Sequence, residues 1–427
     1  MDAYSYDETI APASSGSPLR FDFRTLLVTV ALVAIGLISI YSATHDPNAG
    51  PDAGPPATFV SQLVFAIGGV VAMISLAFLP ERWIRVSTFP LYACGYALLL
   101  AVIAFGTVRY GQKNWIILGP ISLQPSELAK FGTLMMAAVF VNREGRDLSN
   151  WRDIAIVMAI VLGPVPLIML EPDFGSATVY FVMLLGIALW AGADLFLLFS
   201  IVAPAAVAIA ALFGSLQMYI ALGVVLLCML LFRRSIMVTL LGFGLSVVMG
   251  FSTGYVYQHV MQPHQRARID TFLNPNLDPR GAGYHVIQSL MAVGSGGFTG
   301  KGFLHGTQTQ LRYIPEQWTD FIYCVPTEEF GFVGGMAVLI LLGALIWLAV
   351  DTASHLRSKF ESTICFGIAV IFLYHAAINI GMAIGLVPVM GIPLPFLSKG
   401  GSSLLLNMSM VGLLLNFYRF RTDLRRP

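Results

Sequence analysis

The sequence predicts an all-α protein that crosses a membrane many times. Of its 427 residues, 57% are hydrophobic and only 11% are charged, whereas roughly 25% of the residues of an ordinary soluble domain are charged. Apolar runs of about 20 residues, long enough to cross a bilayer as a helix, recur from Thr25 almost to the C-terminus. Because lipid offers the backbone no hydrogen-bond partners, each run is expected to be helical.

Apolar segments between charged or Pro/Gly-rich breaks predict twelve membrane-spanning helices. They cover residues 26–44, 59–80, 87–107, 126–141, 153–170, 175–192, 195–213, 216–232, 235–256, 326–350, 362–386 and 401–419. We predict a single membrane domain over residues 25–420, preceded by a disordered cytoplasmic tail at 1–24 and followed by a cytoplasmic tail at 421–427. An even number of spans leaves both termini on the same side.

The distribution of Lys and Arg predicts a multi-pass protein of the cell membrane with both termini in the cytoplasm, because short cytoplasmic connections are enriched in these residues. In that orientation, nine of the 24 basic residues fall on outer segments. These nine are Arg109, Lys113, Lys130, Arg266, Arg268, Arg280, Lys301, Arg312 and Lys399. Ordinary loop charge would explain them, and so would an anionic ligand held by loops on a scaffold.

The longest segment between spans, residues 258–325, is predicted to be a large extracytoplasmic loop with structure of its own. Residues 285–293 have helical periodicity and precede a Gly-rich stretch, which predicts a short helix that ends in a flexible turn. A polar cluster at residues 313–322 closes the loop. Asp320 within it could cap the following helix, or act as a general base that takes a proton from a sugar hydroxyl.

Two other segments present cations to the outer side. Glu127 and Lys130, three residues apart at the start of the fourth span, can form an ion pair. A lysine one turn inside a span nevertheless usually faces a cavity or counter-ion, so Lys130 could also meet a phosphate. Arg266 and Arg268 suit bidentate phosphate contacts, although exposed arginines are often neutral in effect.

Several polar positions have structural interpretations. Asp173 is expected to cap the helix that follows it. Prolines keep residues 388–398 out of helix, and Ser402 could cap the final span. His375 and Asn379, four residues apart, are expected to share a packing hydrogen bond rather than bind a metal.

The sequence gives no sign of an organic cofactor. It has no Walker loop, dinucleotide fingerprint or haem or zinc pattern, and its four cysteines lack CxxC or Cys/His spacing. The energy of any reaction should therefore reside in the substrate. A membrane scaffold that presents Lys, Arg, Asp, Glu and Ser to the outer leaflet suits a lipid-linked phosphate or diphosphate.

Seven segments resemble the SEDS family, and within it RodA more than FtsW. They are residues 124–130 (QPSELAK), 172–176 (PDFGS), 283–290 (GYHVIQSL), 294–302 (GSGGFTGKG), 305–311 (HGTQTQL), 315–322 (PEQWTDFI) and 393–403 (PLPFLSKGGSS). The resemblance implies a peptidoglycan glycosyltransferase that polymerises lipid II on the outer face of the cytoplasmic membrane during elongation and shape maintenance. By motif match, Asp320 is the essential carboxylate and the general base.

The resemblance also implies partners and further site residues. The partners would be a class B penicillin-binding protein, other elongation-complex membrane proteins, lipid II and undecaprenyl-linked glycan, without nucleic acid. A divalent cation, Mg²⁺ or Mn²⁺, could assist without protein metal ligands. Substrate-binding roles are expected for Lys130, Glu127, Arg266, Arg268, Gln288, Ser289, Lys301, Glu316, Thr319, Ser398 and Ser402. A lipid II flippase and a noncatalytic scaffold for the penicillin-binding protein are the alternatives.

Three departures from the family pattern stand out. Trp318 occupies a position where His is common, which excludes a proton relay through that position, and Lys399 occupies one where Tyr is usual. Residues 195–257 contain three predicted spans where RodA usually has one. The expected fold is therefore a family core of ten helices with an added pair. Because a pair preserves orientation, Asp320 stays on the outer side.

Overall fold

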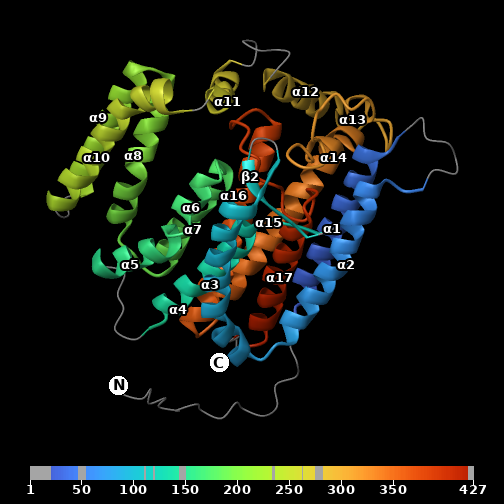
Figure 1. Ribbon diagram of the computed structural model, residues 1–427, viewed down its shortest axis with the longest axis horizontal. Helices are drawn as coiled ribbons and strands as arrows, with labels where there is room; N and C mark the ends of the chain where they lie inside the picture. Colours follow the sequence, from blue (N-terminus) through green and yellow to red (C-terminus); the bar gives the residue numbers. More distant parts are fainter. Residues whose placement is uncertain are drawn as a thin grey trace.

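The computed structural model describes residues 21–46, 54–109, 112–118, 121–143, 151–232, 236–261, 263–274 and 282–421. Within them the chain forms a bundle of long helices, with a second, smaller group of helices beside it (Figure 1). The predicted tails lie mostly outside the described residues. The first helix nevertheless begins slightly earlier than expected, at Phe23, because the Asp22 side chain caps it by accepting from Arg24 N and Thr25 N.

Helices occupy all twelve predicted span positions. They are α1 (Phe23–Thr44), α2 (Ala57–Phe78), α3 (Glu81–Phe105), α4 (Pro125–Val141), α5 (Trp151–Leu162) with α6 (Val165–Leu170), α7 (Phe174–Trp190), α8 (Leu195–Phe213), α9 (Ser215–Phe232), α10 (Ile236–Tyr255), α15 (Gly331–Ser354), α16 (Lys359–Ala383) and α17 (Gly401–Tyr418). Among the described residues, ten helices are long and apolar enough to span a membrane. The 17-residue α4 and α7 fill the other two positions. The protein is an all-α polytopic membrane protein.

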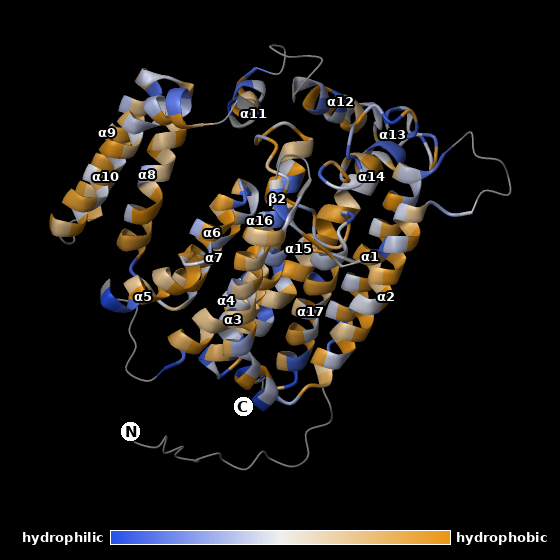
Figure 2. Cartoon of the chain, in the orientation of Figure 1, coloured by the Kyte–Doolittle hydropathy of each residue, from blue (hydrophilic) through white to orange (hydrophobic). Residues whose placement is uncertain are grey.

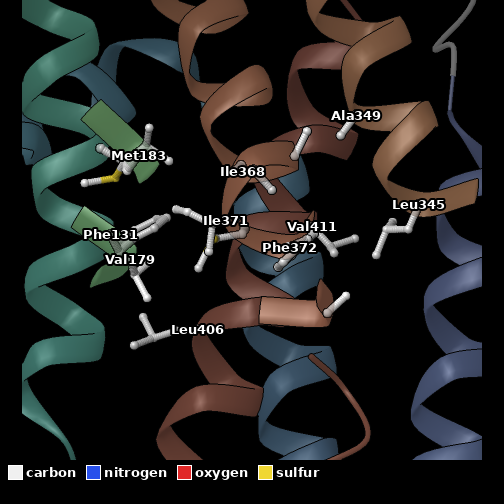
Figure 3. Packing of buried hydrophobic residues seen from close by; sticks show 14 of the residues in the cluster. Phe131, Val179, Met183, Leu345, Ala349, Ile368, Ile371, Phe372, Leu406 and Val411 are labelled. Atoms are coloured by element: carbon white, nitrogen blue, oxygen red, sulfur yellow. The ribbon is translucent and has the colours of Figure 1, made fainter. Parts of the chain in front are cut away.

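The centre of the bundle is formed by α16 and α17. In α17, 83% of the apolar stretch is buried in the protein, against 17% in α10 and 22% in α2. Figure 3 shows the packing around α16, where side chains from α4, α7, α15 and α17 meet it. Figure 2 shows apolar residues along the outer helices as well, which is expected where a helix faces lipid.

The two ends of the described chain lie at the same end of the bundle. The ring of Phe21 stacks on that of Phe78, at the end of α2, and the Arg419 guanidinium lies 5.8 Å from the same ring. The segments between α10 and α15 lie at the opposite end (Figure 1). The beginning and the end of the membrane domain are therefore on one side, as the even number of spans predicts.

Helices α8, α9 and α10 form a unit with a small core of its own. Seven buried side chains make up that core: Phe196, Ala203, Val207, Met218, Leu222, Val225 and Met229. The buried face of α10 consists of Gly242, Ser246 and Gly250. A Cβ at Gly250 would lie 2.9 Å from Val207 Cγ1 of α8, so these small residues let the two helices approach closely.

A small antiparallel sheet was not predicted. It consists of β1 (Thr107–Arg109), β2 (Gln112–Leu118) and β3 (Ile121–Leu123), in the order β1-β2-β3. The segment is too short to span a membrane. Its Trp and β-branched residues favour strands. Its Lys113 Nζ donates to the carbonyl of Ile103 at 2.7 Å, near the end of α3.

The predicted outer loop contains short helices: the π-helix η1 (Val256–Val260), α11 (Pro263–Leu273), α12 (Ala282–Ser295), α13 (Thr307–Gln310) and α14 (Cys324–Glu329). The predicted helix at 285–293 lies within α12. The span expected from residue 326 is instead divided into α14 and α15 at Gly331, which has a φ of +65°. A Cβ there would lie 2.3 Å from Gly300 N, so the close approach of the Gly-rich turn requires glycine at this break.

The α3–α4 contact provides a test of the packing. A Cβ at Gly95 would lie 2.7 Å from the Ala129 Cα, so Gly95→Leu should destabilise the protein by about 1–3 kcal/mol through overpacking. Gly68→Leu on α2 is the control, because nothing lies within 4 Å of a Cβ there. Thermal unfolding in detergent should show a lower midpoint for the first variant alone. Equal midpoints would contradict this contact.

Candidate functional site

Asp320 lies in the connection between α13 and α14, next to the outer end of α16. Its backbone carbonyl accepts a hydrogen bond from Asn379 Nδ2 at 3.0 Å. A Cβ on Gly391 would lie 3.9 Å from its Oδ2. The interpretation of Asp320 as a helix cap is wrong, because α14 begins at Cys324 with Tyr323 in the N-cap position.

The carboxyl group of Asp320 is available for chemistry. It is half-buried, and within the described part of the chain no hydrogen bond to either of its oxygens is found. Burial raises its pKa to about 6, while Arg268 acts to lower the pKa and Glu316 and Asp173 act to raise it. A carboxylate with a pKa near the working pH can accept a proton efficiently.

Two polar side chains of α16 hold the loops around Asp320. The predicted hydrogen bond between His375 and Asn379 is wrong, because each bonds elsewhere. Asn379 Nδ2 donates to Ile392 O at 2.9 Å as well as to Asp320 O. The Nδ1 of His375 lies 3.1 Å from Pro393 O. Their spacing on one helix had indicated a packing role. Their partners lie on loops that are distant in the sequence, so spacing alone could not reveal them.

The predicted Glu127–Lys130 ion pair is present and buried. Lys130 Nζ lies 3.0 Å from both Glu127 oxygens and 3.1 Å from His375 Nε2. Lys130 is 2% exposed and Glu127 is 4% exposed. The three N–H donors of the ammonium are therefore used inside the protein. The pair thus supports the loop at Pro393 from below, and a contact of Lys130 with phosphate stays a prediction.

Ser398 and Thr319 join the last loop to the segment that carries Asp320. Ser398 Oγ donates to Thr319 O at 2.6 Å and accepts from Leu394 N at 2.8 Å. The Thr319 hydroxyl donates to Glu316 O at 3.0 Å. Ser402 was expected to cap α17, but Gly400 occupies the N-cap position and Ser402 is buried in the first turn.

Lys301 organises the Gly-rich part of the loop through a buried carboxylate. Its ammonium lies 2.7 Å from Glu328 Oε1, and the Glu328 side chain is fully buried. Glu328 also accepts from the backbone N–H groups of Gln308 and Thr309, each at 2.9 Å. This network fixes residues 301–309 against α14. A role of Lys301 in substrate binding stays a prediction.

Ser289 and Gln288 lie on α12, and Asp173 precedes α7. Ser289 is buried and its hydroxyl donates to Val286 O within the same helix, at 2.9 Å. Gln288 is half-buried on the same helix.

Asp173 caps α7 as predicted, because its side chain accepts from Ser176 N at 3.0 Å. It also accepts from Asn114 of β2 at 3.1 Å, which ties the sheet to α7.

A cavity of about 370 Å³ lies between α11, α12 and the loop after α16, and its wall residue His285 contacts the segment that carries Asp320. Its wall is mostly apolar and comes from Ala267, Arg268, Thr271, Phe272, His285, Val286, Leu290, Ile384, Gly385, Val387, Pro388 and Val389. The His285 ring lies parallel to that of Phe321, the residue after Asp320. An apolar cavity with a guanidinium group in its wall suits a ligand that has both an anionic and a hydrocarbon part.

The two arginines of α11 have different environments. Arg268 lines the cavity. Arg266 donates to Met261 O at 3.1 Å and to Gln258 O at 2.6 Å, and so fastens α11 to the end of the preceding helix. The sequence does not distinguish the two arginines, because they lie two residues apart in the same polar segment. Arg268 is the arginine of the pair that faces the cavity.

Comparisons with known proteins identify the family. The family model described as "Cell cycle protein", covering FtsW, RodA and SpoVE, matches residues 23–221 and 215–423. The peptidoglycan glycosyltransferase MrdB of Escherichia coli K12 is 32% identical over 96% of each chain. RodA of Treponema pallidum, also named a peptidoglycan glycosyltransferase, is 33% identical over 93% of this chain and 97% of its own.

A solved structure has the same fold. It was described as the structural coordination of polymerization and crosslinking by a peptidoglycan synthase complex. The matching chain has a TM-score of 0.70 and 28% identity, and the match covers 95% of this chain and all of that one. Because the family model and the relatives each cover nearly the whole sequence, this chain belongs to the FtsW/RodA/SpoVE family, the SEDS family that its motifs resemble.

Proposed function

We propose that this protein is a peptidoglycan glycosyltransferase that polymerises lipid II into glycan strands during elongation and shape maintenance. The observation that carries the proposal is the Asp320 carboxyl group, which is half-buried and has a pKa of about 6 that is lowered by Arg268 in the wall of the cavity. Relatives that align over nearly the whole chain are named peptidoglycan glycosyltransferases. The site provides what that reaction needs from a protein.

In the proposed mechanism, Asp320 takes the proton of the 4-hydroxyl on the acceptor sugar. The resulting oxygen attacks the anomeric carbon of the donor and forms the new glycosidic bond with inversion. The bond from that carbon to the diphosphate breaks, and its electron pair remains on the leaving oxygen. Arg268 stabilises this growing negative charge, and the apolar wall of the cavity suits the first isoprenoid units of the carrier.

The polymerase proposal fits the site better than its two alternatives do. A flippase needs a polar path through both leaflets, whereas the cavity and Asp320 lie at one end of the bundle. A noncatalytic scaffold has no need of a carboxyl group with a raised pKa beside an arginine. The polymerase and the flippase make different predictions for a purified system.

We further propose the protein's partner and orientation. A class B penicillin-binding protein would crosslink the strands, in line with the solved synthase complex that coordinates polymerization and crosslinking, and other elongation-complex membrane proteins would be further partners. The protein would lie in the cytoplasmic membrane with Asp320 outside. The end that carries Arg85, Arg419 and Arg421 would then face the cytoplasm with both termini, in accord with the positive-inside rule.

A divalent cation at the site remains a proposal. Among the described residues, no three His, Cys, Asp or Glu side chains lie together as a metal site would require. Mg²⁺ is commonly held by one or two carboxylates together with substrate phosphates. We propose that such an ion would enter bound to the substrate's diphosphate, and we assign it no step.

Removing the proposed base tests the function directly. Asp320→Asn should lower polymerisation at least about 100-fold, because the amide cannot take the acceptor proton. The measurement uses purified protein with its penicillin-binding protein and labelled lipid II, and glycan length is read on a gel. Gly68→Leu serves as the control on the lipid-facing side. Polymerisation by Asp320→Asn at the wild-type rate would exclude the mechanism, and flipping in vesicles without polymerisation would support the transporter.

The pH dependence provides a second test. Because ionised Asp320 is the active form, kcat/KM should rise with pH through about 6 and level off above it. Arg268 lowers the pKa of Asp320, so Arg268→Met should move this rise to higher pH. Lys359→Met is the control, since Lys359 is exposed at the start of α16, at the end of that helix opposite Asn379, and it should leave the midpoint unchanged. Identical shifts in both variants would argue against the assignment of Arg268.

A further inference from the structure

The two unusual residues of the family motifs, Trp318 and Lys399, are neighbours in the structure. The backbone N–H of Lys399 donates to the carbonyl of Trp318 at 2.8 Å. Trp318 lies two residues before Asp320, and Ser398 bonds to Thr319, the residue between them. The backbone of Lys399 is therefore attached to the segment that carries the proposed base.

The backbone on both sides of Lys399 is also held by a side chain of α2. Gln62, a buried side chain of α2, donates to Ser398 O at 3.3 Å and accepts from Gly400 N at 3.2 Å. This amide bridges the residues that flank Lys399 and satisfies one carbonyl and one N–H of the loop. The Cα of Lys399 thus has a defined position, while its side chain remains half-exposed.

Most outer cations are already engaged inside the protein. Five of those whose side chains are described bond to backbone carbonyls or buried carboxylates: Lys113, Lys130, Arg266, Lys301 and Arg312. For the described side chains of Arg268 and Lys399, no hydrogen bond or ion pair within the described residues is found. Arg268 acts electrostatically on Asp320, the backbone of Lys399 is bonded to the Asp320 segment, and both cations have their charge available.

We propose that the Lys399 ammonium group binds the diphosphate of the lipid-linked donor, as a second cation beside Arg268. This inference rests on the proposed function. Each phosphate of a sugar-linked diphosphate carries a negative charge, and Arg268 can balance only one of them. A lysine at Lys399 supplies the other as a mobile point charge, and it does so from a backbone that is fixed relative to Asp320.

Direct binding tests the inference independently of catalysis. Farnesyl diphosphate is titrated into the purified full-length protein, with farnesyl monophosphate and farnesol as comparison ligands. Lys399→Met keeps the chain length but removes the charge, and it should weaken farnesyl diphosphate binding about tenfold, the effect of losing one charge-assisted contact. Farnesol binding should not change. Lys399→Arg should retain most of the affinity for farnesyl diphosphate.

Lys359→Met is the matched control. Lys359 begins α16 at the end of the helix opposite Asn379, and it is exposed, so its loss removes the same charge far from Asp320. Farnesyl diphosphate affinity of Lys399→Met within twofold of wild type would overturn the inference, as would equal losses in Lys399→Met and Lys359→Met. If wild-type protein binds the diphosphate through Lys399 but does not polymerise lipid II, the proposed function fails and the binding site stands.

Discussion

The Asp320 site depends on hydrogen bonds that α16 makes to carbonyls of non-helical backbone. At the edge of a bilayer such carbonyls lack water, so a loop can hold a fixed shape there only if the protein supplies donors. Asn379 supplies one amide to two carbonyls, those of Ile392 and Asp320. One largely buried helix therefore fixes the Asp320 segment and the last loop relative to each other.

The same helix connects the site to the charge pair beneath it. Since the Lys130 ammonium can only donate, the His375 Nε2 that faces it must accept, which leaves the ring proton on Nδ1 to donate to Pro393 O. A protonated ring would bring two cations together. Loss of Glu127 or Lys130 would leave an uncompensated buried charge, at a cost of about 3–5 kcal/mol, and would also remove the partner that orients His375. The ion pair is part of the support of the loop.

Sequence predicted the helices well because lipid imposes a strong constraint on length and polarity. It located all twelve span positions, the helix at 285–293, the Asp173 cap and the Glu127–Lys130 pair, which are determined by local spacing. It missed the small sheet, and it paired His375 with Asn379 because they share a helix face. Their true partners are carbonyls of residues 320, 392 and 393, and no pattern along the chain indicates such contacts. Spacing likewise could not separate Arg266 from Arg268.

The three helices at residues 195–255 are linked to the Asp320 site through α11. The Tyr257 hydroxyl bonds to Asp270 of α11, and Arg266 bonds to carbonyls at the end of the same connection. Helix α11 in turn carries Arg268, whose charge lowers the pKa of Asp320. Since α8, α9 and α10 have their own core, a tilt of this unit against the bundle would move Arg268 relative to Asp320. The position of α8, α9 and α10 therefore bears on the protonation of the proposed base.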